Sequence, residues 1–375
     1  MDYRFTEEEE LLRKTVRNLA KDKIGPIVPE LERKGEFSYE VLDLLKNQGL
    51  LALHFPSEYG GTGGGAVEDC IIIEELGRIY PSAAITIIPN TIVNPLIAGG
   101  NKKYRPRVGS GNCLDAICLT EPSAGSDAAS IKTRAIRQGD HYVLSGTKIF
   151  ITNGGVADIY CIVAVTDPEK RTRGGITNFV VEPDYPGFSV GKIEDKMGLL
   201  GSSTAELILD EVTVPRENVV GEEGEGFKHL MYIFDGSRIG VGAAGLGIAQ
   251  GALDLAIAYA QERVQFGKPI KEFQGLQFML ADMAMQIEAA RALIYKAAVL
   301  FDQGDPEGIR LSSIAKCLGA DAAMRVTTDA VQIFGGYGYM RDYRVEMFMR
   351  DAKGVQIFEG TNQIQRVVTA RYLFK

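Results

Sequence analysis

Glu359 is the residue whose neighbours point most directly to acid–base chemistry. It follows Ile357 and Phe358 and precedes Gly360 in a segment, 355–365, that has no other charged residue. Apolar neighbours desolvate a carboxylate and raise its pKa toward the range in which it serves as a general base. Gly360 leaves room beside that carboxylate for a flat ring or a substrate. The residues alone leave open the alternative that Glu359 caps a turn or pairs with a cation.

Two other segments combine glycines with small polar side chains. Residues 118–127 carry hydroxyls at Thr120, Ser123 and Ser126 and a glycine at 125, a composition that could line a phosphate or a flavin. Residues 332–340 contain three glycines, which can break a helix and bring backbone N–H groups close to a ligand. A polar loop that opens a β domain and a glycine-rich helix corner have the same composition, so both alternatives stay open.

Composition excludes several classes of function. The chain has 375 residues, 45% of them hydrophobic and 24% charged, which is typical of a soluble globular protein. Its net charge of -8 disfavours binding to nucleic acid or to anionic lipid. Five scattered cysteines without a Cys-x-x-Cys pair, and three histidines without metal-ligand spacing, predict neither disulfides nor a metal site. We therefore interpret His54, His141 and His229 as structural or surface residues.

The elements that must position these segments follow the order helices, strands, helices. Apolar residues recur at helical spacing up to about residue 110, β-rich segments with turn signals follow from about 115, and helical patterning returns after about 226. We expect three domains, 1–114, 115–226 and 227–375. This order disfavours a doubly wound nucleotide-binding sheet. The Gly-x-Gly-x-x-Gly match at 240–245 follows a helical segment and not a strand, so it predicts close helix packing.

Two features bear on the cellular compartment. The chain starts with acidic residues and shows neither a basic region followed by an apolar run nor the acid-poor composition of a transit peptide, so a cytoplasmic protein is expected. The apolar stretch 239–260 is interrupted by Gln250 and Asp254 and is rich in glycine and alanine. It therefore predicts a buried, closely packed helix and not a membrane span.

Taken together, five ordered segments resemble the acyl-CoA dehydrogenase family over essentially the whole chain. They are residues 118–127, 150–155, 262–267, 278–283, and 350–353 together with 359–365. The resemblance implies an α+β multidomain fold with an N-terminal helical domain, a middle β-barrel or sandwich domain and a C-terminal four-helix bundle. It also implies FAD as cofactor and a homotetramer.

The resemblance assigns cofactor contacts to three groups of residues. The flavin would meet Ile117, Leu119, Thr120, Gly125, Ser126, Phe150, Ile151 and Thr152. The pyrophosphate and adenosine of a neighbouring subunit's FAD would be held by Arg263, Gln265, Phe266, Phe273, Gln274, Gln332, Gly335 and Gly336. The adenosine end of the cofactor bound to the same subunit would meet Thr361, Asn362 and Gln363.

By the same resemblance, Glu359 is the catalytic base and the acyl-CoA is contacted by Ser126, Asp235, Ser237, Arg238, Glu359 and Gly360. In the family, the thioester carbonyl is held by the backbone N–H of the base and a ribityl hydroxyl. Glu359 would remove the α-proton while the β-hydrogen leaves as hydride to flavin N5, giving trans-2-enoyl-CoA for β-oxidation. Electron-transferring flavoprotein would take up the electrons.

Departures from the family pattern narrow this expectation. Ser237 stands where isovaleryl-type members carry their base, so Glu359 is the sole candidate base. Ser82 stands where glutaryl-type members carry an arginine, which disfavours a dicarboxylic substrate. The bulky residues in 85–93 suggest a short, branched or cyclic acyl group. The alternatives are an enoyl-CoA reductase that runs the reverse reaction and a catalytically silent CoA-binding or assembly protein.

Overall fold

The computed structural model describes residues 5–374 and begins with a layer of helices. Thr6 caps the first of them, since its side chain accepts the Glu9 N–H at 3.2 Å while the Glu9 carboxylate accepts the Thr6 N–H at 2.6 Å. This reciprocal pair satisfies N–H groups that have no partner inside the helix. The helices of this layer are α1 (Glu7–Asn18), α2 (Val28–Lys34), α3 (Tyr39–Asn47), α4 (Ala66–Gly77), α5 (Pro81–Gly100) and α6 (Arg105–Gly109).

The middle of the chain forms one mixed sheet of eight strands. In space the strands run β6-β7-β3-β2-β4-β5-β8, with β1 paired in parallel to β4. Strands β4 and β5 are buried at every position, as expected for the centre of the sheet. The strands are β1 (Asp115–Cys118), β2 (Arg134–Gln138), β3 (His141–Thr152), β4 (Ile159–Val165), β5 (Ile176–Val181), β6 (Phe188–Ile193), β7 (Thr204–Pro215) and β8 (Val219–Val220).

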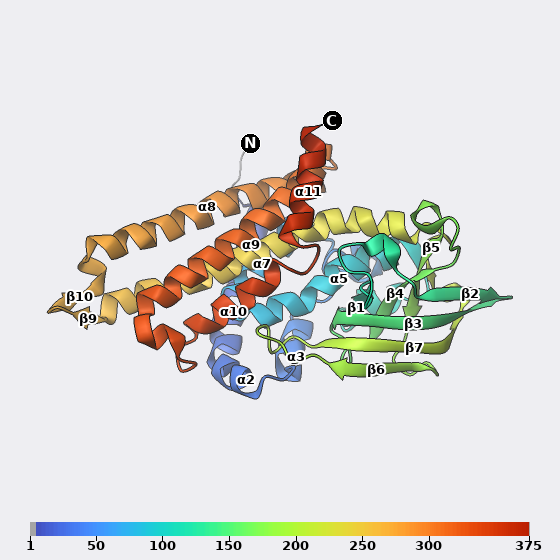
Figure 1. Ribbon diagram of the computed structural model, residues 1–375, viewed down its shortest axis with the longest axis horizontal. Helices are drawn as coiled ribbons and strands as arrows, with labels where there is room; N and C mark the ends of the chain where they lie inside the picture. Colours follow the sequence, from blue (N-terminus) through green and yellow to red (C-terminus); the bar gives the residue numbers. More distant parts are fainter. Residues whose placement is uncertain (1–4, 375) are drawn as a thin grey trace.

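Long helices occupy the last third of the chain and extend away from the sheet (Figure 1). A short hairpin, β9 (Val264–Gln265) and β10 (Lys268–Pro269), lies at the end of the helices remote from the sheet. This arrangement of helical ends around a middle sheet confirms the predicted fold class. The helices are α7 (Gly226–Glu262), α8 (Gln274–Asp302), α9 (Pro306–Phe334), α10 (Val345–Val355) and α11 (Asn362–Leu373).

Glycines let α7 and α9 approach each other closely. A Cβ atom on Gly245 would lie 2.6 Å from the Gly319 carbonyl oxygen, and one on Gly242 would lie 2.9 Å from that of Ala315. A Cβ on Gly319 would meet the Gly242 carbonyl oxygen at 2.4 Å. Any side chain at these positions would therefore force the helices apart. The prediction that the Gly-x-Gly-x-x-Gly match serves helix packing is confirmed.

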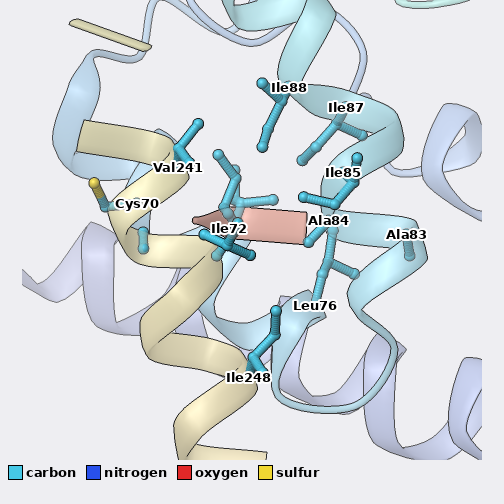
Figure 2. Packing of buried hydrophobic residues seen from close by; sticks show 14 of the residues in the cluster. Cys70, Ile72, Leu76, Ala83, Ala84, Ile85, Ile87, Ile88, Val241 and Ile248 are labelled. Atoms are coloured by element: carbon cyan, nitrogen blue, oxygen red, sulfur yellow. The ribbon is translucent and has the colours of Figure 1, made fainter. Parts of the chain in front are cut away.

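The core joins the N-terminal layer to the long helices. Figure 2 shows Ile72 of α4, Ile87 and Ile88 of α5 and Val241 of α7 pointing into one shared apolar interior. Two of these helices, Pro81–Gly100 and Gly226–Glu262, are long and apolar enough to cross a membrane, yet 78% and 72% of their most apolar windows are buried inside the fold. Their composition therefore matches that of core helices, as predicted for residues 239–260.

Candidate active site

Glu359 lies in the turn that connects α10 to α11, in a backbone conformation that favours glycine. Its φ is 51°, and the φ of the next residue, Gly360, is 80°. A left-handed conformation is costly for a residue with a side chain and persists where the surroundings enforce it. A Cβ on Gly360 would lie 2.5 Å from Nε2 of Gln365. The conformation at 360 thus favours glycine, and a side chain there would also displace the Gln365 amide.

Hydrogen bonds from two buried side chains hold this turn. The Lys316 ammonium on α9 donates to the Gly360 carbonyl oxygen at 2.9 Å and to Oδ1 of Asn362 at 2.9 Å. The Gln365 amide on α11 donates to the carbonyl oxygens of Glu359 at 3.0 Å and Gly360 at 3.2 Å. Lys316 and Gln365 are both fully buried. These bonds keep the Glu359 backbone in its unfavourable conformation.

The surroundings of Glu359 move its pKa close to neutrality. Burial raises the pKa of this carboxyl to about 7, against the opposing charges of Arg238 and Lys316 and a hydrogen bond from Ser237. Burial also lowers the pKa of Lys316 to about 8. The side chain of Glu359 nevertheless keeps some accessible surface. A carboxylate with this pKa and some exposure has the properties of a general base at neutral pH.

Ser237 connects Glu359 to a small cavity. Ser237 lies on α7, where its hydroxyl helps to lower the pKa of Glu359 and donates to the Phe234 carbonyl oxygen at 3.4 Å, and it also lines a cavity of about 120 Å³. On the same helix, Arg238 pairs with Asp235 at 2.5 Å. The structure therefore brings together the predicted residues Asp235, Ser237, Arg238 and Glu359. The cavity is lined by His54, Ala66, Asp69, Thr91, Pro95, Tyr232, Ile233, Gly236, Ser237, Gly240 and Phe301.

The residues predicted to shape the acyl pocket are divided between this cavity and the core. Within 85–93, Thr91 lines the cavity. Ile87 and Ile88 are instead buried in the apolar interior shown in Figure 2.

A loop of small polar residues lies beside the end of β3. Ser126 and Gly125 are exposed, and a Cβ on Gly125 would meet nothing within 4 Å. Phe150 has a φ of 56° and is 60% exposed, whereas the neighbouring Ile151 is buried in the sheet. An exposed aromatic ring and an open glycine backbone offer a surface on which a flat ring can lie. Ile117, Leu119, Thr120 and Thr152 are half-buried around this surface.

A buried ion pair anchors this loop to the sheet. The ammonium of Lys148 on β3 donates to Glu121 at 2.8 Å and to the Leu119 carbonyl oxygen at 3.1 Å. Glu121 also accepts the backbone N–H groups of Lys132 and Thr133, at 2.6 and 2.9 Å. Burial alone would raise the pKa of Glu121, but Lys148 and these donors hold it below its usual value.

Replacement of Glu121 by Gln is expected to destabilise the fold by about 3–5 kcal/mol, because it leaves the ammonium of Lys148 buried without an opposite charge. Urea unfolding followed by circular dichroism measures this loss. The exposed Glu30, which pairs with Arg33 on the surface, provides the control Glu30→Gln, whose midpoint should stay near that of the parent. Equal midpoints for both variants would contradict the anchoring role.

A second, larger groove of about 750 Å³ lies at the far end of the long helices. Arg263 lies over the ring of Tyr337 at 5.3 Å, and the ring of Phe266 is 94% exposed. Cβ atoms on Gly335 and Gly336 would meet nothing within 4 Å, so the backbone there is open to a ligand. The groove collects most of the residues predicted to hold pyrophosphate and adenosine, namely Arg263, Gln265, Phe266, Phe273, Gln332, Gly335 and Gly336. Gln274 begins α8 directly after this group.

Within one chain, the two expected cofactor regions do not meet. The groove lies beside the β9–β10 hairpin, whereas the β3 end and the α10–α11 turn lie toward the sheet (Figure 1). Near that turn, Thr361 caps α11 and Gln363 is exposed. Asn362 is buried, and its amide donates to Asp321 at 2.8 Å.

Sequence reasoning did not single out Lys316. The available signal was a lysine within a helical run of small residues, where Ala315, Gly319 and Ala320 are all buried. A charged residue on a buried helix face requires a specific partner. That partner, the turn after α10, is more than forty residues away in sequence, as the contact between Lys316 and Gly360 shows.

Comparisons with known proteins agree along the whole chain. Three family models match, described as the acyl-CoA dehydrogenase N-terminal domain (residues 6–111), middle domain (116–212) and C-terminal domain (224–374). The chain is 48% identical to cyclohex-1-ene-1-carbonyl-CoA dehydrogenase of Geobacter metallireducens, with 98% of each chain covered.

Two solved structures are similar over 100% of both chains and at 45% identity. One is butyryl-CoA dehydrogenase from Megasphaera elsdenii, with a TM-score of 0.96. The other, with a TM-score of 0.97, belongs to work on the electron transferring flavoprotein of Acidaminococcus fermentans and flavin-based electron bifurcation.

Proposed function

Because this chain belongs to the acyl-CoA dehydrogenase family, we propose that it dehydrogenates a short acyl-CoA with Glu359 as the base. It is a flavin-dependent oxidoreductase that acts on an acyl-CoA thioester. The observation that carries the assignment of the base is the position of Glu359, in a held turn with a pKa of about 7, beside the cavity that Ser237 lines. The relatives named for butyryl-CoA and cyclohexene-carbonyl-CoA support a small acyl group.

The chain's own groups suit proton abstraction next to a carbonyl. In the described part of the chain, no group accepts the backbone N–H of Glu359, so it is free to bind the thioester oxygen. That hydrogen bond stabilises the negative charge that develops on the oxygen and makes the α-proton more acidic. The Glu359 carboxylate then takes the α-proton. The β-hydrogen leaves with its electron pair, and the product is the trans-2-enoyl-CoA.

We propose FAD as the form of the flavin. Hydride acceptance is the chemistry that the flavin supplies when bound. The exposed Phe150 and open Gly125 fit a flat isoalloxazine ring, with Thr152 nearby. The groove of about 750 Å³ fits a dinucleotide's adenosine and pyrophosphate, because it combines Arg263, an exposed aromatic ring and open glycine backbones.

The separation of these two regions in one chain supports a homotetramer in which one subunit's groove completes the cofactor site of its neighbour. Electron-transferring flavoprotein is the proposed electron acceptor, supported by the similar chain from work on that flavoprotein of Acidaminococcus fermentans. A cytoplasmic location is proposed from the sequence and from the bacterial relatives. The dehydrogenase direction is favoured over the reductase because the relatives are named as dehydrogenases.

Purified enzyme should be yellow, and the anaerobic addition of a suitable short acyl-CoA should bleach its flavin absorbance. The value of kcat/KM for this bleaching should rise with pH through about 7, because Glu359 acts as a base only when it is deprotonated. The sign follows from the raised pKa, since protonated Glu359 predominates below about pH 7 and is inactive. Stopped-flow absorbance across pH 5.5 to 9 measures both effects, and butyryl-, isobutyryl- and cyclohexanecarbonyl-CoA form a suitable panel.

No bleaching by any thioester of the panel would contradict the dehydrogenase function. If bleaching occurs at a rate that does not change between pH 6 and 8, the dehydrogenase function stands. A catalytic base with a pKa of about 7 would then be rejected. Reduction of enoyl-CoA that is much faster than oxidation of acyl-CoA, with the same electron carrier, would instead favour the reductase.

A further inference from the structure

The cavity beside Ser237 has a polar pair in its lining that the reaction described above does not use. Nδ1 of His54, in the loop after α3, lies 3.1 Å from Oδ2 of Asp69 on α4. Both residues line the cavity, as does Thr91 of α5. The other walls are mainly apolar, with Pro95, Ile233 and Phe301 among them. The cavity thus extends from Ser237, near Glu359, to the hydrogen-bonded pair of His54 and Asp69.

The pair leaves hydrogen-bonding capacity unused. Only 6% of the Asp69 surface is exposed, and its Oδ1 has no hydrogen-bond partner within the described residues. Because the Asp69 carboxylate accepts a hydrogen bond from Nδ1, that nitrogen carries a hydrogen, and Nε2 of His54 has no hydrogen-bond partner among the described residues. The Thr91 hydroxyl donates to the Ile88 carbonyl oxygen at 2.8 Å, which leaves its oxygen able to accept. Buried polar groups without partners are costly, so a ligand that satisfies them gains affinity.

His54 is held firmly in this position. Its φ of 57° lies in the left-handed region, which is uncommon for a residue with a side chain. Asp302 accepts the N–H groups of Ala66 and Val67 at 2.8 and 3.1 Å and so fixes the start of α4, the helix that carries Asp69. A fixed histidine–aspartate pair is the kind of arrangement that discriminates between ligands, because it cannot relax around a missing partner.

The charges around the pair decide which polar group fits. Burial lowers the pKa of His54, but the hydrogen bond and charge of Asp69 and the charge of Asp302 more than offset this and raise it. A carboxylate on the ligand would face these two acids and is disfavoured. A hydroxyl can donate to neutral Nε2 or accept from protonated Nε2–H, so it pairs with His54 in either state.

The size of the cavity limits the acyl group. An apolar cavity of about 150 Å³ holds one benzene molecule, so a cavity of about 120 Å³ accepts about five non-hydrogen atoms. We propose that His54, oriented by Asp69, is a specificity-determining residue that selects short acyl-CoA thioesters with a hydroxyl at the end of the acyl chain. This inference rests on the proposed function and names the substrate class for the same site.

The test uses the purified holoenzyme and matched pairs of thioesters. The pairs are 4-hydroxybutyryl-CoA with butyryl-CoA, and 5-hydroxypentanoyl-CoA with pentanoyl-CoA. Anaerobic stopped-flow bleaching gives kcat/KM for each, and in one pair the hydroxylated thioester should be preferred at least about tenfold, as expected for a hydroxyl that satisfies a buried donor and acceptor.

The variant His54→Leu should lose this preference, so that the two thioesters of each pair give about the same kcat/KM. Asp69→Asn, which changes the shape little, should lower the same preference and serves if His54→Leu does not fold. The matched control is His141→Leu, which removes a histidine paired to Asp140 at 3.2 Å on the protein surface and should leave the preference unchanged.

The outcomes separate this inference from the function on which it rests. If the unsubstituted thioesters bleach the flavin with a kcat/KM equal to or higher than that of their hydroxylated partners, the hydroxyl preference is rejected. The dehydrogenase function would still stand. An unchanged preference in both His54→Leu and Asp69→Asn would show that other residues select the hydroxyl. No bleaching by any short acyl-CoA would reject both proposals.

Discussion

Glu359→Gln is expected to lower the rate of flavin bleaching by about 10²- to 10⁴-fold while the protein keeps its yellow cofactor. The amide retains the size and much of the hydrogen bonding of the carboxylate, yet it cannot accept the α-proton. Its neighbours Lys316 and Gln365 hold the turn through the backbone oxygens of Glu359 and Gly360, which the substitution leaves in place, and they should hold it as before. Single-turnover stopped-flow absorbance with a saturating short acyl-CoA isolates this step from electron transfer.

Two further variants make the assignment of the base stricter. Glu307→Gln changes an exposed carboxyl at the start of α9 and should leave bleaching unaffected. Because Ser237 lies close enough to Glu359 to affect its pKa, Ser237→Glu in the Glu359→Gln background places a carboxylate near the same position from helix α7. Partial recovery of bleaching is expected. Full activity in Glu359→Gln alone would mean that another group removes the proton.

The sequence was sufficient for features that depend on local pattern. The close packing at Gly242 and Gly245 follows from small residues at fixed spacing, and the structure confirms it. Strands β3, β4, β5 and β7 coincide with runs of β-branched and aromatic residues. Strand β6 has a weak sequence signal because Phe188–Ile193 contains Gly191 and Lys192 and is mostly exposed, as an edge strand is.

Long-range contacts were beyond the reach of sequence patterns. The residues next to Glu359 identify it only as an acid in an apolar turn. Its role as the catalytic base was predicted from the resemblance to a family. Neither predicted that Lys316 binds the same turn, or that His54 and Asp69 line a cavity with Ser237. His54 was expected to be structural or on the surface, because spacing along the chain says nothing of a carboxylate fifteen residues away on a helix face. Such pairs depend on tertiary packing, which brings side chains together irrespective of sequence period.

Lys316→Met is expected to lower kcat/KM for flavin bleaching near pH 7 about tenfold and to move the rising limb of the pH profile to higher pH. In the parent, the Lys316 ammonium stabilises ionised Glu359 and counteracts the burial that raises the pKa of that carboxyl to about 7. Without this charge the pKa of Glu359 rises further, so less of it is ionised at neutral pH.

The pH range of this effect follows from Lys316 itself. Because its pKa is about 8, the ammonium is present below that pH and is progressively lost above it. The variant should therefore differ most from the parent between pH 6 and 8 and converge with it in alkaline buffer. Lys353→Met, at an exposed position near the end of α10, is the matched control and should keep the parent profile. A uniform loss at every pH would indicate instead that Lys316 acts only by holding the turn through the Gly360 carbonyl oxygen.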